Sequence, residues 1–483
     1  MRPTNALTAV SALAVTLSGV AAYGAIALTA PSALAGPARS TSIIVVSPTG
    51  NDSNAGTVSA PLRTIQVAVQ RLPNGGTVEL LAGHYHQKVR FSGVHDLTLR
   101  PYGTQVAVLD GSGLTPPQGT SALVNISDST DITIDGLGIT GYRTDKLGIV
   151  PIGVYMHGHD RGINIVDNHV YRLGNDNGTL GSFNINAHGI AAYGDDPHGA
   201  IRDLVIRGNT VDHLRTGASE SVVVNGNVNH WSITHNHIFD NDNIGIDAIG
   251  YEPTLTGKYR YTNADRARHG VIAHNRVSHI QSRGNPSYWD HGWCNCADGI
   301  YIDGGTHIQV RANHVTTSDI GIEVAAENGK GTADFVNVLH NHITGSLFTG
   351  IATGGYCNDK PNCGGVRTGS SHDNRFAYNV LRGNNQLNDG SPELLIQYHT
   401  YRDTFVHNTI TATNRGHVVY GTVPNADTDG HPIGNRSDDN RFRAVGVGQA
   451  NAEFGWLGHT YVGFAKYQRA SGQDAHSKYL TAA

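Results

Sequence analysis

An asparagine that recurs after a short apolar strand pattern most strongly constrains how this chain of 483 residues folds. The unit appears as INIVDNHV, LVIRGNTV, WSITHNHI and five further copies, with Asn at positions 168, 209, 236, 275, 313, 341, 379 and 408. The spacings between these positions are 41, 27, 39, 38, 28, 38 and 29 residues. Because a unit repeated at such periods is typical of a stacked repeat, the short spacings predict one coil of a parallel β-helix. The long spacings predict the same coil with about ten inserted residues.

A second strand pattern accompanies the Asn units, as in HGIAAYG, IGIDAIG, DGIYIDGG and IGIEVAAE. No coil of at least two short strands can bury its apolar side alone, so the coils must stack. We expect the Asn residues to adopt the left-handed turn conformation and to form a ladder of amides about 4.8 Å apart. The neighbouring histidines are expected to form an exposed structural stack: His235, His237, His274, His314, His340 and His342. The HNH triplets at 235–237 and 340–342 follow from this repeat and do not indicate a nuclease.

The N-terminal residues 1–35 have the features of a secretory signal peptide. Arg2 precedes a mildly apolar run from Ala6 to Ala30, and Ala33-Leu34-Ala35 supplies a small-residue cleavage site. An uncleaved membrane anchor is the alternative. We expect a secreted mature chain, with a β-helix over residues 36–445 and a C-terminal capping segment over 446–483. No other apolar run approaches the ~20 residues of a membrane helix, so no membrane association is expected after cleavage.

The charge of the mature chain bears on its partners. One of the 34 basic residues and none of the 39 acidic residues lie in residues 1–35, so the remaining chain carries a net charge of −6. This balance argues against a nucleic-acid partner. Charged residues make up only 15% of the chain and Gly contributes 60 residues, which favours short strands joined by tight turns. We expect an all-β monomer.

The two ends of the repeat resemble those of known proteins. The segment 46–93 contains Gly50-Asn51-Asp52, Pro61-Leu62, Gly76-Thr77-Val78 and Gly83-His84-Tyr85. It resembles the start of secreted right-handed parallel β-helix proteins of the pectate-lyase-like superfamily, especially polysaccharide lyase family 9 and its relatives. The resemblance implies a single-stranded right-handed parallel β-helix. A short N-terminal capping helix is expected to bury one apolar face: Leu62, Ile65, Ala68, Val69 and Leu72. The C-terminal segment 461–477 resembles the closing segment of bacterial β-helix proteins, with Phe464 and Tyr467 covering the last coil.

Four cysteines in a secreted chain suggest disulfides. Cys357 and Cys363 bracket the short loop NDKPN, and we expect a local bridge between them. Cys294 and Cys296 would form a second bridge or remain a free pair. Zinc is a minor alternative, since these spacings are poor for a zinc finger.

The strand alternation places an acidic patch on three consecutive coils. With Ile246, Ile300, Ile322 and Ile351 facing the core, the outward positions carry the following side chains: Asp247, Tyr301, Asp303, Glu323 and Glu327. Asp298 lies at a turn that breaks the alternation, so its direction stays open. Glu393 and Gln397 are expected to extend this outer face. The flanking coils have Ala191, Tyr193, Ala352 and Gly354 at the aligned positions. Like charges at this spacing repel and raise one another's pKa, so a local acidic patch favours a functional site over a solvated face.

Three functions fit the acidic patch, and the first is preferred. Glycoside hydrolysis needs one protonated and one ionised carboxyl group. Asp303 would be the nucleophile or base and Glu323 the acid, with Asp247, Asp298 and Glu327 as tuning groups or substitutes. The Cα atoms of Asp303 and Glu323 would lie roughly 8 Å apart from the strand spacing and rise. This chemistry requires no cofactor.

The second function is a Ca²⁺-dependent lyase or epimerase acting on uronate polymers, with Ca²⁺ held by Asp247, Asp303 and Glu323. Family 9 lyases use adjacent aspartates and a lysine base, but no Asp-Asp pair lies on the acidic strands. The catalytic residues of that family are therefore not carried over. The third function is a non-catalytic, glycan-binding or adhesive β-helix.

Side chains near the acidic patch would bind the sugar. Flat rings stack on sugar faces, and we expect this role for five side chains: Tyr251, Tyr288, Trp289, Trp293 and Tyr301. His291, Arg283 and His399 would contact hydroxyl or carboxyl groups. The acidic strands also resemble those of β-helix carbohydrate-active enzymes, which implies a poly- or oligosaccharide as the partner.

Overall fold

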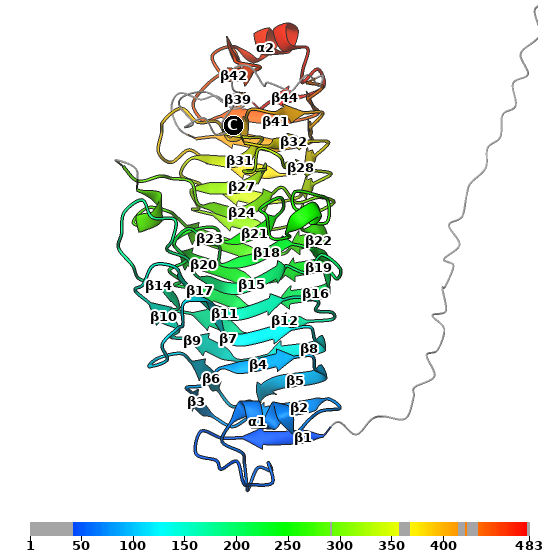
Figure 1. Cartoon of the computed structure of the whole chain (residues 1–483). Helices are drawn as coiled ribbons and strands as arrows, with labels where there is room; N and C mark the ends of the chain where they lie inside the picture. Colours follow the sequence, from blue (N-terminus) through cyan, green and yellow to red (C-terminus); the bar gives the residue numbers. More distant parts are fainter. Residues whose placement is uncertain (1–41, 290–291, 357–367, 414–420, 423–432, 481–483) are drawn as a thin grey trace, which may run out of the picture. The chain divides into compact units, whose positions relative to one another are not determined.

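The computed structural model describes residues 42–289, 292–356, 368–413, 421–422 and 433–480. The predicted signal peptide and Cys357, Cys363 and His291 lie outside these residues. The strands fall into three long parallel sheets that the chain visits in turn, coil after coil (Figure 1). Among the described residues, no helix combines the length and the apolar character that a membrane crossing would require.

Three strands, one from each sheet, make up a coil, and every pairing within these sheets is parallel. The first sheet contains β1 (Ile43–Val46), β2 (Gly76–Leu80), β5 (His95–Pro101), β8 (Thr130–Asp135), β12 (Asn164–Val166), β16 (Ile201–Arg207), β19 (Val228–Thr234), β22 (Arg268–Ala273), β25 (Gln309–Arg311), β29 (Asn337–Leu339), β33 (Arg375–Ala377), β37 (Thr404–Val406) and β40 (Arg436–Asp438). The second contains β3 (Gly83–Tyr85), β6 (Ala107–Asp110), β9 (Gly138–Thr140), β13 (His169–Tyr171), β17 (Thr210–Asp212), β20 (His237–Asn241), β23 (Arg276–Ile280), β26 (His314–Thr316), β30 (His342–Thr344), β34 (Val380–Arg382), β38 (Thr409–Ala412), β41 (Arg441–Ala444) and β44 (Lys478–Tyr479). The third contains β4 (Val89–Ser92), β7 (Gly119–Ser127), β11 (Ile149–His157), β15 (His188–Gly194), β18 (Val222–Gly226), β21 (Ile246–Ile249), β24 (Asp298–Asp303), β27 (Ile320–Ala325), β31 (Thr349–Thr353), β35 (Leu394–Ile396) and β39 (Gly421–Thr422).

Short elements lie in the turns and at the ends. They are β10 (Arg143–Thr144), β14 (Gly174–Asn175), β28 (Thr332–Asp334), β32 (Ser370–His372), β36 (Thr400–Tyr401), the antiparallel pair β42 (Glu453–Trp456) and β43 (His459–Val462), the helices α1 (Ile65–Gln70) and α2 (Phe464–Ser471), and the 3-10 turns η1 (Gly257–Tyr259) and η2 (Pro286–Tyr288). The parallel β-helix predicted from the repeat is therefore confirmed, with three strands in each coil.

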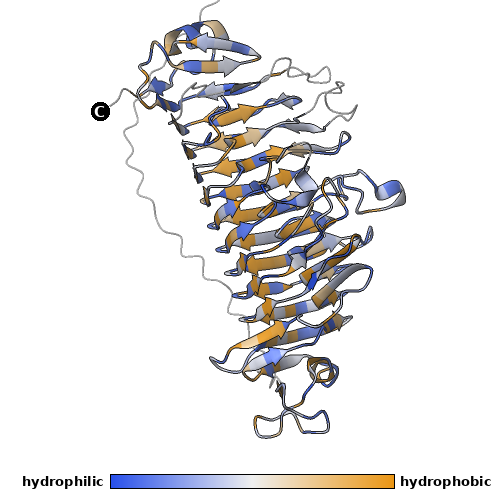
Figure 2. Cartoon of the chain, turned by 90° about the vertical axis from the view of Figure 1, so that its left-hand side faces the viewer, coloured by the Kyte–Doolittle hydropathy of each residue, from blue (hydrophilic) through white to orange (hydrophobic). Residues whose placement is uncertain are grey.

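One apolar core runs through the stacked coils, and Figure 2 shows its hydrophobic segments recurring from strand to strand. Ile246, Ile300, Ile322 and Ile351 are in register and fully buried, as the alternation predicts. The helix α1 buries Ile65, Ala68 and Val69, so the predicted N-terminal cap is confirmed. At the other end, Phe464 and Tyr467 of α2 are buried against the last coils, also as predicted.

The predicted amide ladder is present and continues one coil further than the repeat indicated, to Asn440. Each Asn side-chain oxygen accepts the backbone N–H of the preceding ladder Asn at 2.8–3.0 Å and its side-chain NH₂ at 3.0–3.2 Å. The ladder satisfies buried turn groups from Asn168 to Asn440 and fixes the stacking of successive coils.

The prediction that the ladder Asn adopts the left-handed conformation is wrong. The residue before each Asn has the positive φ instead, with 57° at His235 and 58° at His274. The physical reason is that the preceding residue makes the turn with its side chain outward, which leaves the Asn side chain free to point along the stack. The outward rings stack on one another as expected, with His235 and His274 5.0 Å apart and His314 and His342 5.1 Å apart.

Candidate active site

The acidic patch is built on β21, β24 and β27 of the third sheet. Asp247 pairs with Tyr301, and Tyr301 pairs with Glu323, so these three side chains form one column across the strands. Asp303 lies two residues further along β24, opposite Ala325. The parallel register of the coils therefore brings together acidic residues that are up to 76 positions apart in the sequence.

The inward position of Gly299 settles the direction of Asp298, which the sequence left open. A Cβ on Gly299 would lie 2.5 Å from Cγ1 of the core residue Val315, so this position faces inward, as Ile300 also does. Two consecutive inward positions shift the alternation by one residue. Asp298 consequently points outward, where it lines a cavity and hydrogen-bonds to Glu323.

Two adjoining cavities lie over the acidic strands. The larger has a volume of about 550 Å³ and is lined by Ile244, Tyr288, Cys294, Asn295, Cys296, Asp298, Tyr301, Ile320, Glu323, Glu327, Phe348, Tyr356, Leu387, Asp389 and Gln397. The smaller has a volume of about 310 Å³ and is lined by Ala218, Glu220, Ile244, Asp247, Ile249, Glu252, Tyr288, Tyr301, Asp303, Glu327 and Asn328. We call these the mixed cavity and the acidic cavity. Tyr288, Tyr301 and Glu327 line both, so the two spaces form one groove.

The acidic strands are less exposed than the alternation predicts. Asp247 and Asp298 are each 2% exposed, Glu323 is 7% exposed and Asp303 is 8% exposed, whereas Glu327 is exposed at the rim. The expectation of an open acidic face is wrong because the loop around η2 and side chains following β31 and β34 cover the sheet. Carboxyl groups held in such a groove lose most of their hydration.

Burial and crowding change the acidity of these groups. Burial, with added repulsion from Glu327, raises the pKa of Glu323 to about 8, although the hydrogen bond from Asp298 acts in the opposite direction. Burial and the nearby Glu323 raise the pKa of Asp298 well above its usual value. Burial and Glu220 do the same for Asp247. At neutral pH the groove therefore holds protons that isolated carboxylic acids would have lost.

Asp303 differs from the other buried acids in the hydrogen bond it receives. Burial and Glu327 raise its pKa, but its Oδ1 accepts the backbone N–H of Glu327 at 2.7 Å. Such a donor stabilises the ionised form of a carboxyl group. Asp303 is thus better suited than Asp247 to remain a carboxylate.

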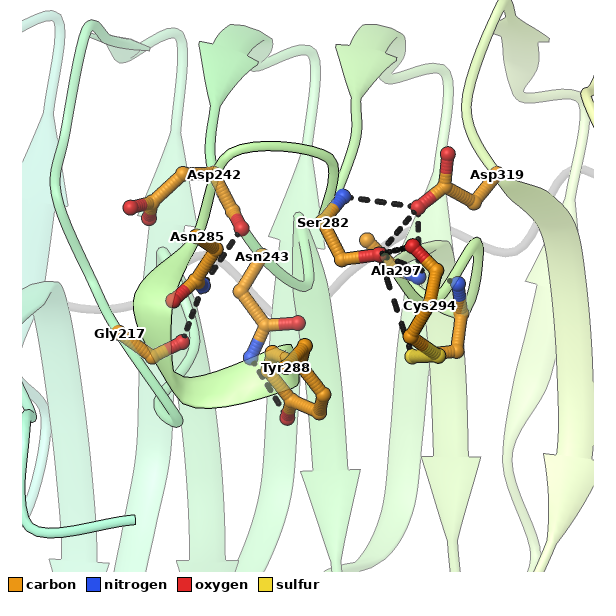
Figure 3. The surroundings of a disulfide bond; sticks show 10 residues. Gly217, Asp242, Asn243, Ser282, Asn285, Tyr288, Cys294, Ala297 and Asp319 are labelled. Carbon is orange, nitrogen blue, oxygen red and sulfur yellow. Dashed lines mark hydrogen bonds between the residues drawn. A yellow bond between two sulfur atoms is a disulfide. The ribbon is translucent and has the colours of Figure 1, made fainter. Parts of the chain in front are cut away.

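The loop between β23 and β24 contributes Tyr288, Cys294, Asn295 and Cys296 to the lining of the mixed cavity. Figure 3 shows how Asn285, Tyr288 and Cys294 of this loop lie against their neighbours. Asn285 donates its side-chain NH₂ to the carbonyl oxygens of Gly217 and Asp242 at 2.7 and 2.8 Å, which anchors η2 to earlier coils. Tyr288 then reaches Asn243, whose NH₂ donates to the phenol oxygen at 3.1 Å. These contacts hold the Tyr288 ring over the groove.

The other end of the same loop is fixed by a disulfide and by Asp319. Cys294 and Cys296 are bonded, which was one of the two outcomes predicted for this pair. Oδ2 of Asp319 accepts the N–H and the hydroxyl of Ser282, each at 2.7 Å, and the N–H of Ala297 at 3.1 Å (Figure 3). Both cysteines line the mixed cavity, so the disulfide shapes the site itself.

Of the residues predicted to bind sugar, Tyr288 and Tyr301 line the groove, but several others do not. Gln397, which was predicted to extend the acidic face, also lines the mixed cavity. His399 is fully buried at a turn, so it does not reach solvent. Tyr251 is buried with its ring 4.9 Å from the guanidinium of Arg266. Glu393 accepts two hydrogen bonds from Asn384 at 2.8 and 2.7 Å, because the shifted alternation turns it away from the groove.

The remaining predicted contacts lie on the outer part of the loop. Trp289 and Trp293 pack edge to face with centroids 4.7 Å apart and are absent from the lining of both cavities. Arg283 is exposed and also lies outside the lining. These three side chains therefore lie on the loop but do not line the groove.

Several lining residues were missed by the sequence analysis. Glu220 precedes β18 and Glu252 follows β21, so both sit in turns where strand alternation gives no direction. Tyr356, Phe348, Leu387 and Asp389 come from later loops. Of these missed residues, only Glu220 and Glu252 could have been found from the sequence, because they lie next to the aligned strands of the third sheet.

The three carboxyl groups predicted to hold Ca²⁺ are divided between the two cavities. Asp247 and Asp303 line the acidic cavity, whereas Glu323 lines the mixed cavity. Among the described residues, the group of three side chains whose ligand atoms lie within 4.8 Å of one another is Asp438, Asp439 and His476, at the C-terminal end. There, Nδ1–H of His476 donates to Oδ2 of Asp438 at 2.8 Å, and Arg436 lies 3.6 Å from the same carboxylate.

Comparison with known proteins places the chain in a family. It is 32% identical over 444 residues to the uncharacterized protein YwoF of Bacillus subtilis (strain 168), which covers 90% of this chain and 87% of YwoF. It is 32% identical over 126 residues to pectate lyase PEL9 of Emericella nidulans, covering 25% of this chain and 31% of that protein. No protein-family model matches the chain.

Among solved structures, the family 28 exopolygalacturonase of Yersinia enterocolitica is similar in fold, with a TM-score of 0.52 at 13% identity. The match covers 86% of this chain and 78% of the exopolygalacturonase. The chain therefore belongs to the family of Bacillus subtilis YwoF, and its fold is the right-handed parallel β-helix of the pectin-lyase-like proteins.

Proposed function

We propose that this protein is a secreted enzyme that hydrolyses a glycosidic bond, with Glu323 as the general acid and Asp303 as the base. The observation that carries this proposal is the pair of carboxyl groups with different surroundings in one groove. Glu323 is buried against Asp298, and its pKa of about 8 keeps it protonated at neutral pH. Burial and Glu327 raise the pKa of Asp303, and the backbone N–H that its Oδ1 accepts opposes this rise and favours the carboxylate form.

The spacing of the two groups favours inversion at the anomeric carbon. Glu323 lies one strand from Tyr301, and Asp303 lies two residues beyond Tyr301 on the same strand. The ~4.8 Å strand spacing and ~3.3 Å rise then give a separation of about 8 Å for side chains that point the same way. Inverting enzymes have carboxyl groups roughly 6.5–9.5 Å apart, which leaves room for a water molecule. Tyr301 lies beside both groups, opposite Glu323 and two residues before Asp303, and would pack against the sugar ring.

The names of two similar proteins accord with a glycan substrate. One is a pectate lyase and the other is an exopolygalacturonase, so both names denote enzymes that act on carbohydrate. The groove also has aromatic side chains, Tyr288, Tyr301 and Tyr356, beside its carboxyl groups. Concave sites lined by aromatic rings and a few polar groups are typical of small-ligand recognition.

A polysaccharide panel tests the proposal. The full chain and the variants Asp303→Asn and Glu323→Gln are incubated with neutral, acidic and amino polysaccharides, and reducing ends and product masses are measured. General acid–base catalysis contributes about 100-fold to 10,000-fold, so each variant should lose at least about 100-fold in kcat/KM. The matched control is Asp145→Asn, because Asp145 is 71% exposed beside Lys146 on the surface and should leave the rate unchanged.

Other outcomes would refute hydrolysis. An unsaturated product that absorbs in the ultraviolet would identify a lyase, and a loss of activity with a chelator would support the Ca²⁺-dependent alternative. Binding without turnover of any polysaccharide would identify a non-catalytic glycan-binding protein. Equal activity of Asp303→Asn, Glu323→Gln and Asp145→Asn would exclude the two assigned roles.

A further inference from the structure

We propose that the glycan bound in this groove carries free amino groups, and that the acidic cavity around Asp247 binds the ammonium group of an amino sugar. The inference names the substrate class of the proposed hydrolase site and therefore rests on that function. It is independent of which carboxyl group acts as acid or base.

The described residues that line the groove include many carboxyl groups and no basic side chain. Five carboxyl groups line the acidic cavity, and the mixed cavity adds three more: Glu220, Asp247, Glu252, Asp303 and Glu327, then Asp298, Glu323 and Asp389. No Lys, Arg or His is among the described residues that line either cavity. A site for a uronate polymer needs cations to neutralise the carboxylates of its substrate, because like charges in a poorly hydrated groove repel strongly.

The basic residues nearest to the acidic strands are engaged elsewhere. Arg266 is 2% exposed and donates to Asp334 at 2.9 Å and to the carbonyl oxygens of Gly304 and Gly305, each at 2.9 Å. The ammonium of Lys330 lies 4.4 Å from the ring centroid of Tyr261. Burial lowers the pKa of His188 to about 4, so this residue stays neutral beside Glu220. None of these groups supplies the positive charge that the cavity lacks.

Among the described residues, three buried carboxylate oxygens of the groove accept no hydrogen bond: Oε2 of Glu220, Oδ1 of Asp247 and Oδ1 of Asp298. Asp247 and Asp298 are each 2% exposed. A buried acceptor without a donor destabilises the folded protein, so such oxygens indicate a ligand that brings its own donors. An ammonium group brings three donors and a positive charge, and it fits a compact site better than a planar guanidinium.

The division of the groove fits the two parts of an amino sugar. The acidic cavity holds Asp247 and Asp303 at its floor and would take the ammonium group. The mixed cavity beside it presents Tyr356, Phe348 and Leu387, whose apolar surfaces suit the faces of neighbouring sugar rings. A neutral glycan would fill the same space but would bring no positive charge to offset the repulsion among these crowded carboxyl groups.

The experiment compares charge states of one polymer. Binding and hydrolysis by the full chain are measured with soluble polyglucosamine and polygalactosamine, with their fully N-acetylated forms, and with polygalacturonate. We expect at least one amino polymer to bind or react at least about 100-fold better than its N-acetylated form, since removing one member of a buried charge pair typically has this effect. In Asp247→Asn this preference should fall toward unity, whereas Asp145→Asn should keep it. Thermal unfolding of each variant verifies that it folds.

The outcomes separate the inference from the proposed hydrolysis. Binding of an amino polymer without turnover would support the amino-glycan inference while refuting hydrolysis. Hydrolysis of a neutral glycan without preference for the amino form would support hydrolysis and overturn the inference. Action on polygalacturonate, or a Ca²⁺-dependent response of Asp247→Asn, would overturn it as well. Failure to bind either amino polymer would also overturn it.

Discussion

Removing one asparagine from the middle of the amide ladder should destabilise the stacked coils by an amount that the structure allows us to work out. Asn275 is fully buried. Its side-chain oxygen accepts the backbone N–H of Asn236 at 2.9 Å and the Asn236 side chain at 3.0 Å. Its NH₂ donates to the carbonyl oxygen of Ile233 at 2.9 Å and to the side chain of Asn313 at 3.0 Å.

The substitution Asn275→Ala would take these partners from two buried backbone groups, the N–H of Asn236 and the carbonyl of Ile233. Each buried polar group left without a partner costs about 1–3 kcal/mol. The side chains of Asn236 and Asn313 keep other hydrogen bonds, so we count only the backbone groups. The free energy of unfolding should therefore fall by about 4 kcal/mol, within a range of about 2–6 kcal/mol.

Urea unfolding followed by circular dichroism measures the change, and amide hydrogen exchange at Asn236 locates it. Because each coil contacts only its neighbours, exchange should accelerate around residues 233–236 and 275–313 more than at the caps. The control is Asn164→Ala on the outer side of β12, where the side chain makes one hydrogen bond, to Gly162 at 3.1 Å. This variant should lose less than about 1.5 kcal/mol. A loss below about 1 kcal/mol in Asn275→Ala, or a loss equal to that of Asn164→Ala, would refute the ladder's stabilising role.

Two further predictions concern the groove. Because Glu323 must be protonated to act as the acid, kcat/KM should decline as pH rises through about 8. The same raised pKa means that the folded protein holds a proton that the unfolded chain releases near pH 4.5; the free energy of unfolding should thus fall between about pH 4.5 and 8, and this slope should be smaller in Glu323→Gln. If both pH profiles are identical in the wild-type chain and Glu323→Gln, the assignment is wrong. Replacing Cys294 and Cys296 together by Ser opens a loop of three residues, which should change stability by less than about 2 kcal/mol. Since both residues line the mixed cavity, kcat/KM should decline at temperatures where the melting curve shows that the variant is still folded. An unchanged kcat/KM would contradict a role of this loop in the site.

The repeating parts of the fold could be predicted because their signals are local and periodic. The Asn spacing indicated the coils, and the alternation around Ile300 and Ile322 gave the correct register of three acidic strands. The cap residues Ile65 and Tyr467 were identified from apolar side chains near the ends. In each case the same physical requirement recurs at a fixed spacing, so one sequence suffices to detect it.

The covering of the site could not be predicted in the same way. The direction of Asp298 depends on the inward position of Gly299, and glycine is too frequent in this chain to mark that position. The burial of Asp247 depends on loops such as the one anchored by Asn285, whose path is fixed by contacts with distant coils. His399 was misplaced for the same reason, because a turn residue follows no alternation. Loop closure over a sheet is a tertiary property that periodicity does not report.

An inward glycine precedes Ile246, Ile300 and Ile322 of the third sheet. Gly245, Gly299 and Gly321 face the core at equivalent positions, while the aligned outward residues differ: Asp247, Tyr301 and Glu323. Within one repeat, the inward positions thus determine the stacking of the coils, and the outward positions carry the reactive side chains. A point substitution could place an acidic group on the next coil, about 4.8 Å away, and the stacking of the coils would not change. Outward positions recur on every coil at this fixed spacing. Reactive groups can therefore be placed at distances that suit different sugar units.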